Sequence, residues 1–444
     1  MNKPRFCEGS IFRHVIVMAG TGAIGLMSIF IVDFFNLFYL STLGNSEITA
    51  AIGFANAINF LQLAICIGMT IGITVITARL VGARKQELAQ RIVTCFLVVT
   101  TVLMLMIGIC IASSRYSILY TLGARDKVLE QASHFTGIVS PFSFLIALGM
   151  ITSGLLRAVG NARKSMNITV LGALVAALLD PLFILGFHLG IKGAAISTIL
   201  SRLTVVTFGF YFLIPYNLLQ KPNWHYLLHD SYRVFKISFP AILTNLASPV
   251  ASLFIVRTMS RFGNNAISGQ TAIDRIVPLA FSFIFALTGS VGPIISQNFG
   301  AGIRKRVYKT LTVSLKLVLF CAFCTWIFFF FSERWIIKLF SLKAEGAELM
   351  ELFCHWVILS NLFLGLLFVS NTVFNNLEYP LLSTLFNWGR ATLGTIPFIW
   401  IGSAYGPKGV LIGQALGVVP FGILSVICSF YIVKHVKMDR PFFN

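Results

Sequence analysis

Long apolar runs separated by short polar or Gly/Pro-containing breaks extend over nearly the whole chain. A run of about 20 apolar residues crosses the roughly 30 Å hydrocarbon core of a bilayer as one helix. Because a helix satisfies its own backbone hydrogen bonds in lipid, the pattern predicts an all-α polytopic membrane protein. The expected spans are near residues 14–40, 47–77, 92–114, 131–156, 166–188, 191–216, 237–260, 269–297, 310–332, 350–373, 381–403 and 408–434.

The charge pattern gives these spans an orientation. Only 11% of the 444 residues are charged, and the formal net charge is +19. When the loops are assigned to alternate sides, the side that holds both termini carries about twice as many Lys and Arg residues, which marks the cytoplasm. We therefore expect a multi-pass protein of the cell (inner) membrane with both termini cytoplasmic. Its basic face would meet anionic lipid and not nucleic acid.

The two halves of the chain resemble each other. Each half holds six spans, an even number, so both insert in the same orientation and their pseudo-two-fold axis is expected along the membrane normal. We predict an N-terminal lobe at 1–216, a cytoplasmic linker at 217–236 and a C-terminal lobe at 237–444. The landmarks that align at nearly one spacing are Gly44 with Gly263, Gly82 with Gly300, Pro181 with Pro397 and Gly193 with Gly409.

Two acidic residues lie inside apolar runs. Asp33 is in FIVDFF and Asp180 is in ALLDPLF. A carboxylate at this depth costs from about 3 to more than 10 kcal/mol, so it normally faces water, pairs or binds a proton. A structural hydrogen bond between helices is the alternative. The repeat places Ser252 and Ile396 at the matching positions of the second half, which predicts that the first lobe handles the ion.

Neighbouring residues extend this hypothesis. Asn36 is one helical turn from Asp33 and is a candidate to orient it. Pro181 is expected to kink its helix and to free a carbonyl near Ala177 as a cation ligand. A purely structural kink is the other interpretation, and Pro397 favours it because the second half keeps the proline without an acid.

Amides on the second span are candidates to line a cleft. Asn56, Asn59 and Gln62 fall on successive turns, and hydrogen bonding between helices explains them equally well. Arg390 and the pair Asp274 and Arg275 lie near the expected span ends, where reaching for the interface or a local ion pair is the simpler interpretation.

Four motifs together resemble the multidrug and toxic compound extrusion (MATE) family, in its prokaryotic DinF-type branch. The resemblance implies an antiporter that alternates between outward-facing and inward-facing states. It also implies that Asp33, Asp180 and Thr198 bind the coupling ion. The motifs are LSTLGNSEITAAIGFANAI (40–58), GLLRAVGNARKSM (154–166), LLDPLFILGFHLGIKGAAIST (178–198) and SQNFGAGIRKR (296–306).

One departure from that branch bears on the ion. Where the branch often has asparagine, one turn before the acid of the fifth span, this chain has Ala176. A sodium site at Asp33 and Asp180 would lack one oxygen ligand, so a proton is favoured and sodium is the alternative. No other cofactor or metal is expected. The acids of other branches are also absent from the seventh span.

The expected cargo is a small organic compound. A cleft lined by some of the 42 Phe residues would suit bulky organic cations. The alternative within the same superfamily is a flippase for lipids or lipid-linked oligosaccharides, which would need a basic central cavity. No HExxH, P-loop or GxSxG motif lies in a polar segment, so an enzyme is not expected.

Overall fold

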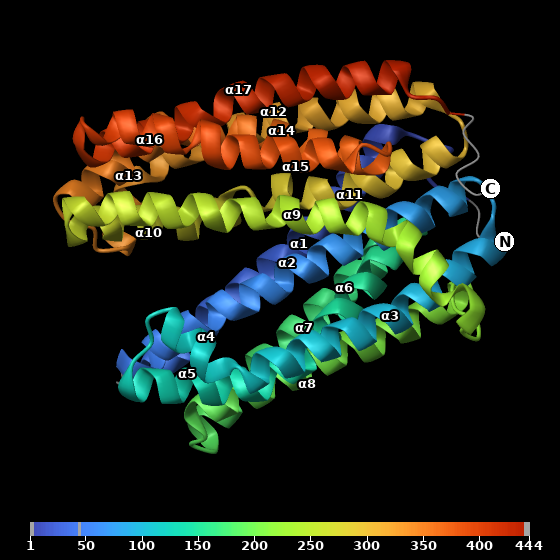
Figure 1. Ribbon diagram of the computed structural model, residues 1–444. Helices are drawn as coiled ribbons and strands as arrows, with labels where there is room; N and C mark the ends of the chain where they lie inside the picture. Colours follow the sequence, from blue (N-terminus) through green and yellow to red (C-terminus); the bar gives the residue numbers. More distant parts are fainter. Residues whose placement is uncertain (1–3, 43–45, 439–444) are drawn as a thin grey trace. The chain divides into compact units, whose positions relative to one another are not determined.

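The computed structural model describes residues 4–42 and 46–438. Within these residues all regular structure is helical, which confirms the predicted fold class of an all-α polytopic membrane protein (Figure 1). Gly44, one of the repeat landmarks, lies outside the described residues. The chain divides into two compact units, one built mainly from Ile24–Ile242 and the other from Phe6–Ala23 together with the chain from Leu243 onward.

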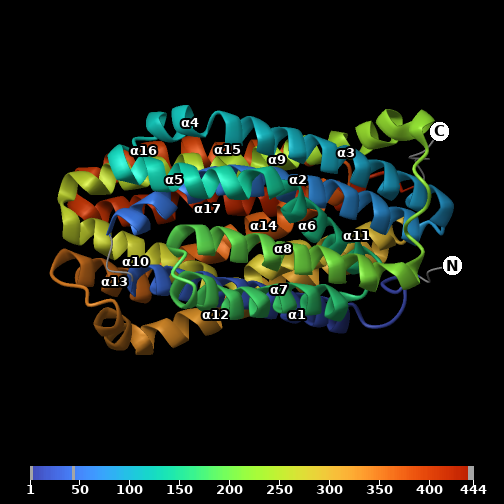
Figure 2. The ribbon, with the colours of Figure 1, turned by 90° about the horizontal axis from the view of Figure 1, so that it is seen from below.

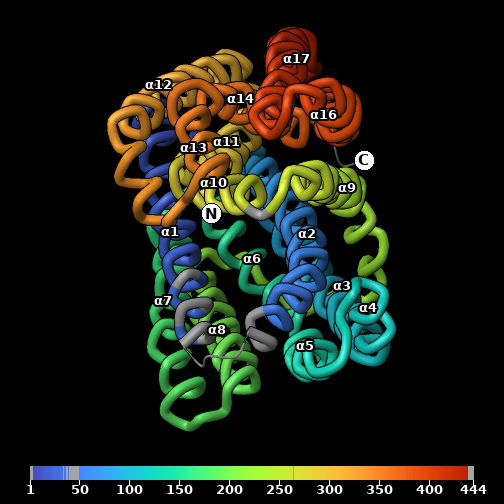
Figure 3. Tube along the Cα trace, turned by 90° about the vertical axis from the view of Figure 1, so that its left-hand side faces the viewer, coloured from blue at the N-terminus to red at the C-terminus, as the bar shows by residue number. Residues whose placement is uncertain are grey.

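The first unit is built around α8. This helix packs against α5, α6 and α7, while α2 packs against α5 and α6 (Figure 3). Its apolar core includes the fully buried side chains of Ala51, Leu119, Ile184 and Ala195. The helices are α1 (Ile11–Thr42, which continues from the second unit), α2 (Ser46–Gly82), α3 (Gln86–Ser113), α4 (Arg115–Thr121), α5 (Asp126–Val139), α6 (Ser143–Ala158), α7 (Ala162–Pro181), the π-helix η2 (Leu182–Gly186) and α8 (Gly190–Leu213).

The second unit is built around α14 and α17, which pack along each other (Figure 2). Its helices are α9 (Leu227–Met259, which begins in the first unit), α10 (Asn264–Ala280), α11 (Ser282–Gly300), α12 (Arg304–Leu339), α13 (Glu345–His355), α14 (Ser360–Asn376), α15 (Pro380–Gly389), the π-helix η7 (Arg390–Gly394), α16 (Ile396–Ser403) and α17 (Gly406–His435).

The same packing pattern occurs in both units. In the first, α6 packs against α2, α3 and α8, and α7 packs against α8. In the second, α14 packs against α11, α12 and α17, and α16 packs against α17. Equivalent helices therefore make equivalent contacts, as expected for two six-span lobes that share one ancestral pattern.

Each of the twelve predicted spans has a helical counterpart in the described residues. Ten single helices are long and apolar enough to cross a membrane, and α10 with α11 adds an eleventh span bent by 47°. The twelfth is the predicted span 381–403, where η7 interrupts the helix between α15 and α16. The predicted start of the tenth span at 350 was wrong, because α13 ends at His355 and the span proper begins after Trp356.

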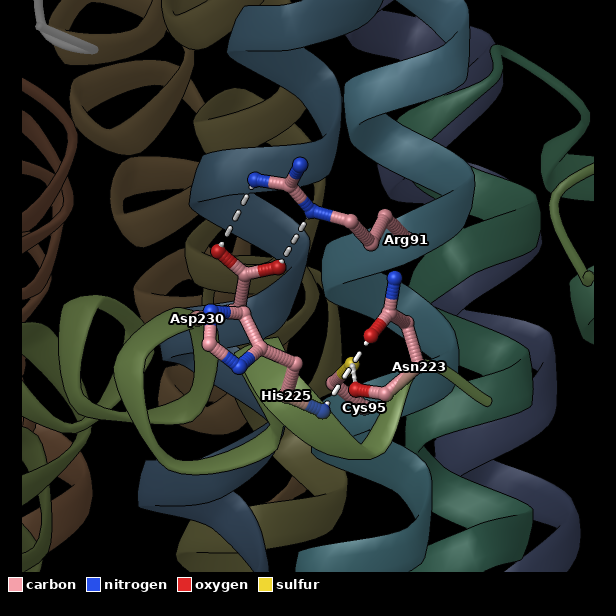
Figure 4. Close-up of polar contacts among 5 residues, drawn as sticks. All are labelled: Arg91, Cys95, Asn223, His225 and Asp230. Atoms are coloured by element: carbon pink, nitrogen blue, oxygen red, sulfur yellow. Dashed lines mark hydrogen bonds and ion pairs between the residues drawn. The ribbon is translucent and has the colours of Figure 1, made fainter. Parts of the chain in front are cut away.

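The segment predicted as a linker, 217–236, is held against α3. Arg91 donates to both carboxylate oxygens of Asp230, at 2.7 and 3.2 Å (Figure 4). The guanidinium also stacks over the Tyr226 ring, 4.3 Å from its centroid. The Asn223 side-chain oxygen accepts a hydrogen bond from the His225 backbone amide at 3.1 Å. The Asn223 backbone carbonyl accepts a hydrogen bond from Cys95 Sγ. The second half of this segment is therefore the start of α9 and not an irregular connection.

Candidate functional site

Asp180 is placed at the end of α7 and is almost fully buried, with 2% of its surface exposed. Asn36 of α1 donates a 2.9 Å hydrogen bond from Nδ2 to Asp180 Oδ2. We had expected Asn36 to orient Asp33, one turn away on its own helix. The amide reaches across to α7 instead, and it thereby joins α1 to the fifth-span acid.

Asp33 lies close to this pair. Its side chain is exposed and is near enough to Asp180 and to Arg202 for their charges to interact. The two acids predicted from the sequence, one on α1 and the other on α7, are thus brought together within the first unit. The Asp33 side chain is exposed, whereas Asp180 is almost completely buried.

Helix α8 comes near the same carboxyls. Its small residues permit this approach: a Cβ on Gly193 would lie 2.5 Å from the Phe183 carbonyl oxygen of η2. Ser197 is fully buried, and its hydroxyl lies close enough to Asp180 to interact with that carboxylate. Thr198, the residue predicted from the resemblance, donates instead to the Ala194 carbonyl of its own helix at 2.8 Å. Its hydroxyl oxygen keeps lone pairs for a further contact.

The backbone around Pro181 has an irregularity that the prediction of a kink and a freed carbonyl near Ala177 did not include. Helix α7 runs through Pro181 and then widens into η2, where the Phe187 amide bonds to the Leu182 carbonyl at 2.9 Å. The second unit has the π-helix η7 just before Pro397. A π-helix next to the proline therefore occurs with the acid in one unit and without it in the other.

The three amide side chains on α2 become more buried along the helix. Asn56 is exposed, Asn59 is half-buried and Gln62 is completely buried. Neither the nitrogen nor the oxygen of the Gln62 side-chain amide has a hydrogen-bond partner among the described residues. One turn further along α2, Cys66 lies within electrostatic range of Arg202. The α2 face that includes Gln62 and Cys66 therefore borders the charged cluster.

Arg202 is the residue that sequence reasoning missed. It lies on α8 one turn after Thr198, and its Nη1 atom is buried with no hydrogen-bond partner in the described part of the chain. The signal was present in ISTILSRLTVV, because an arginine inside an apolar run is as unusual as an acid there. With Asp33, Asp180 and Arg202 all ionised, this cluster carries one net negative charge.

Two other expectations about span ends need correction. Arg390 is buried, with 9% of its surface exposed, and donates from Nη2 to Ser248 Oγ at 3.2 Å; none of the ion pairs between described residues includes it. Asp274 lies well inside α10 and not at its end. Intramembrane acids are therefore not confined to the first lobe.

The described residues contain no group of three or more His, Cys, Asp or Glu side chains that could hold a metal ion. The donor set around Asp180 consists of carboxylate, hydroxyl and amide groups. Such groups suit a proton or a hard monovalent cation and not a soft metal.

The chain is similar to known transport proteins over most of its length. The MatE family matches residues 23–182 and 240–401. A Shewanella oneidensis protein named FAD transporter is 27% identical over 441 residues, which cover 96% of this chain and 95% of that protein. The multidrug export protein MepA of Staphylococcus aureus (strain bovine RF122 / ET3-1) is 25% identical over 323 residues, 70% of each chain.

Solved structures share the fold. A mutant of the Vibrio cholerae MATE transporter VcmN matches with a TM-score of 0.92 at 22% identity, over 98% of this chain and 99% of that one. A MOP superfamily transporter from Pyrococcus furiosus matches with a TM-score of 0.90 at 19% identity, over the same shares. The family match spans both units, and the chain therefore belongs to the MatE family of multidrug efflux transporters, which are not enzymes.

Proposed function

We propose that this protein is an antiporter that exports small organic compounds, mainly organic cations, in exchange for an ion that binds at Asp33 and Asp180. The protein would lie in the cell (inner) membrane with both termini in the cytoplasm. The observation that carries the proposal is the hydrogen bond from Asn36 to Asp180 beside exposed Asp33. Two acids and one amide thus lie together within membrane-spanning helices, where an unpaired charge is energetically costly.

The charge of the cluster explains how one ion can drive a conformational change. Asp33 and Asp180 contribute two negative charges and Arg202 one positive charge. Binding of a single monovalent cation then leaves the cluster neutral, which lets α1 repack against α7 and α8. By linkage, cargo and ion must weaken each other's binding by the same factor.

A proton remains the favoured ion, and sodium is the alternative. Sodium needs several oxygen ligands, and Ala176 supplies none from its side chain. The Ser197 hydroxyl beside Asp180 supplies a further oxygen at the site, which strengthens the sodium alternative. Arg202 does not separate the two ions, because its fixed positive charge disfavours binding of a proton and of a sodium ion alike.

The experiment is cargo efflux from proteoliposomes under an imposed pH gradient or an imposed sodium gradient. We expect the pH gradient to drive export of ethidium by the wild-type protein, and we expect Asp33→Asn to abolish this export while the protein stays folded. Equal export by wild type and Asp33→Asn would exclude the proposed role of the acid.

An anionic cargo is the second candidate. The Shewanella oneidensis relative is named FAD transporter, and Arg202 has a buried donor atom without a partner. A guanidinium suits phosphate groups. Parallel efflux assays with FAD and with ethidium separate the two candidates, and a lipid-flipping assay tests the flippase alternative.

A further inference from the structure

Helix α10 has one small, apolar face and one polar face. On the apolar face it packs closely on α13, since a Cβ on Gly269 would lie 2.9 Å from the Gly346 Cα (Figure 3). The opposite face is exposed and carries almost only polar side chains. The exposed residues are Asn265, Ser268, Thr271, Asp274, Arg275 and Leu279.

Lipid-facing surface in the same unit is different. Helix α12 exposes large apolar side chains, which match the hydrocarbon of a bilayer: Leu319, Phe320, Phe323, Phe328 and Phe331. Charged groups such as Asp274 and Arg275 would be costly against lipid tails, so they face the bundle interior or water. The polar face of α10 is therefore suited to water and not to lipid tails.

Asp274 lies far along this polar face. It is ten residues after the first residue of α10, and a helix rises 1.5 Å per residue, which places it about 15 Å from the helix start. That distance is half of the roughly 30 Å hydrocarbon core. A carboxylate at this level marks a functional position by the same reasoning that applies to Asp33 and Asp180.

The Asp274 carboxylate is held in place. Gln270, which is 2% exposed, donates from Nε2 to Asp274 Oδ1 at 3.0 Å. No ion pair within the described part of the chain includes Asp274. The neighbouring Arg275 is exposed on the same face and carries its charge at the end of a long side chain, whereas the Asp274 carboxylate is one methylene from the backbone and is held by Gln270. The fixed charge on this face is therefore negative, and pre-organised charge favours binding of a cation.

We propose that Asp274 binds the positively charged centre of the transported compound. This inference rests on the proposed export of organic cations and adds a division of labour to it. The second unit recognises the charge of the cargo through Asp274, while the first unit binds the coupling ion through Asp33 and Asp180. Leu279, on the next turn of the exposed face, offers apolar contact for the body of the cargo.

The test is equilibrium binding to the purified full-length protein. The probes are tetraphenylphosphonium, a lipophilic cation, and triphenylphosphine oxide, a neutral compound of similar shape. We expect Asp274→Asn to weaken tetraphenylphosphonium binding at least tenfold and to leave triphenylphosphine oxide unaffected. Asparagine keeps the hydrogen bond from Gln270, so the variant should fold. Asp274→Glu should restore cation binding, and Arg275→Gln should tighten it.

A second measurement separates this inference from the proposed function. The shift in melting temperature caused by lowering the pH or by adding sodium should persist in Asp274→Asn and disappear in Asp33→Asn/Asp180→Asn. Unaltered tetraphenylphosphonium binding by Asp274→Asn, absence of binding by the wild type, or loss of the ion-induced shift in Asp274→Asn would each overturn the inference. Absence of the shift in the wild type would refute the ion site alone, and the binding measurement would still decide the role of Asp274.

Discussion

The Asn36 amide donates a 2.9 Å hydrogen bond to the Asp180 carboxylate although the two residues are 144 positions apart in the chain. This contact ties α1 to the end of α7. It also places Asp33, one turn earlier on α1, next to the second acid. A rearrangement of α1 therefore changes the surroundings of both carboxyls at once, which is what coupling of ion binding to conformation requires.

Replacing Asn36 by Ala removes this donor from a carboxylate that is 2% exposed. A hydrogen bond to a charged group contributes about 1.5–3 kcal/mol. The ion-free carboxylate loses this stabilisation, whereas the ion-bound form loses less. We expect the coupling ion to bind roughly tenfold more tightly, because 1.4 kcal/mol corresponds to a factor of ten. The ion concentration that gives half-maximal transport reports the change, and an unchanged or higher value would contradict it.

Ser197 distinguishes the two candidate ions. If a proton is the coupling ion, Ser197→Ala should change the half-maximal ion concentration by less than about threefold, because a proton needs no further oxygen ligand. The transport rate should not depend on the sodium concentration. A loss of sodium-driven transport by more than about tenfold in this variant would instead identify the Ser197 hydroxyl as a sodium ligand. Thr198→Val removes the neighbouring hydroxyl on the same helix and is the parallel variant to Ser197→Ala.

Arg202 sets the charge of the ion site. Arg202→Gln changes the formal charge of the cluster from one to two negative charges, so two monovalent cations are then needed for neutrality. The measurement is the cargo gradient at which net flux reverses under a known ion gradient. Its dependence on the ion gradient should become about twice as steep in Arg202→Gln, in proportion to the number of coupled ions. Lys316→Gln, which removes an exposed charge from α12 of the other unit, should leave the slope as in the wild type. Equal slopes for wild type and Arg202→Gln would exclude this role.

The pair Arg91 and Asp230 predicts a stability effect separate from transport. The Asp230 side chain is fully buried and Arg91 is partly exposed. Arg91→Met leaves the carboxylate without its partner and should cost about 3 kcal/mol of folding free energy. Thermal unfolding in detergent measures the loss. The double variant Arg91→Met/Asp230→Leu should recover most of it, because no uncompensated charge remains. A double variant as unstable as the single one would contradict this account.

Local sequence patterns predict the whole fold class but only part of the candidate ion site. Apolar runs predict the spans because bilayer thickness imposes their length, and Asp33 and Asp180 stood out because charge is rare at that depth. Arg202 lies inside a span, so a count of the basic residues in the loops does not include it. A search of the spans for charges of either sign identifies Arg202 in the same way as Asp33 and Asp180. The early start of α9 had no local signal, since the Asp230 partner Arg91 lies 139 residues away. The π-helices at Leu182–Gly186 and Arg390–Gly394 depend on packing against neighbouring helices, which the sequence does not display.

The most direct measurement of the account is ion release on cargo binding to the purified protein in weakly buffered detergent solution. Addition of ethidium to the wild type should release about one proton per protein molecule, because cargo and ion exclude each other and the cluster holds one net charge. The Asp33→Asn/Asp180→Asn variant should bind ethidium and release none. Release of the same number of protons by this variant would show that the coupling ion is bound elsewhere.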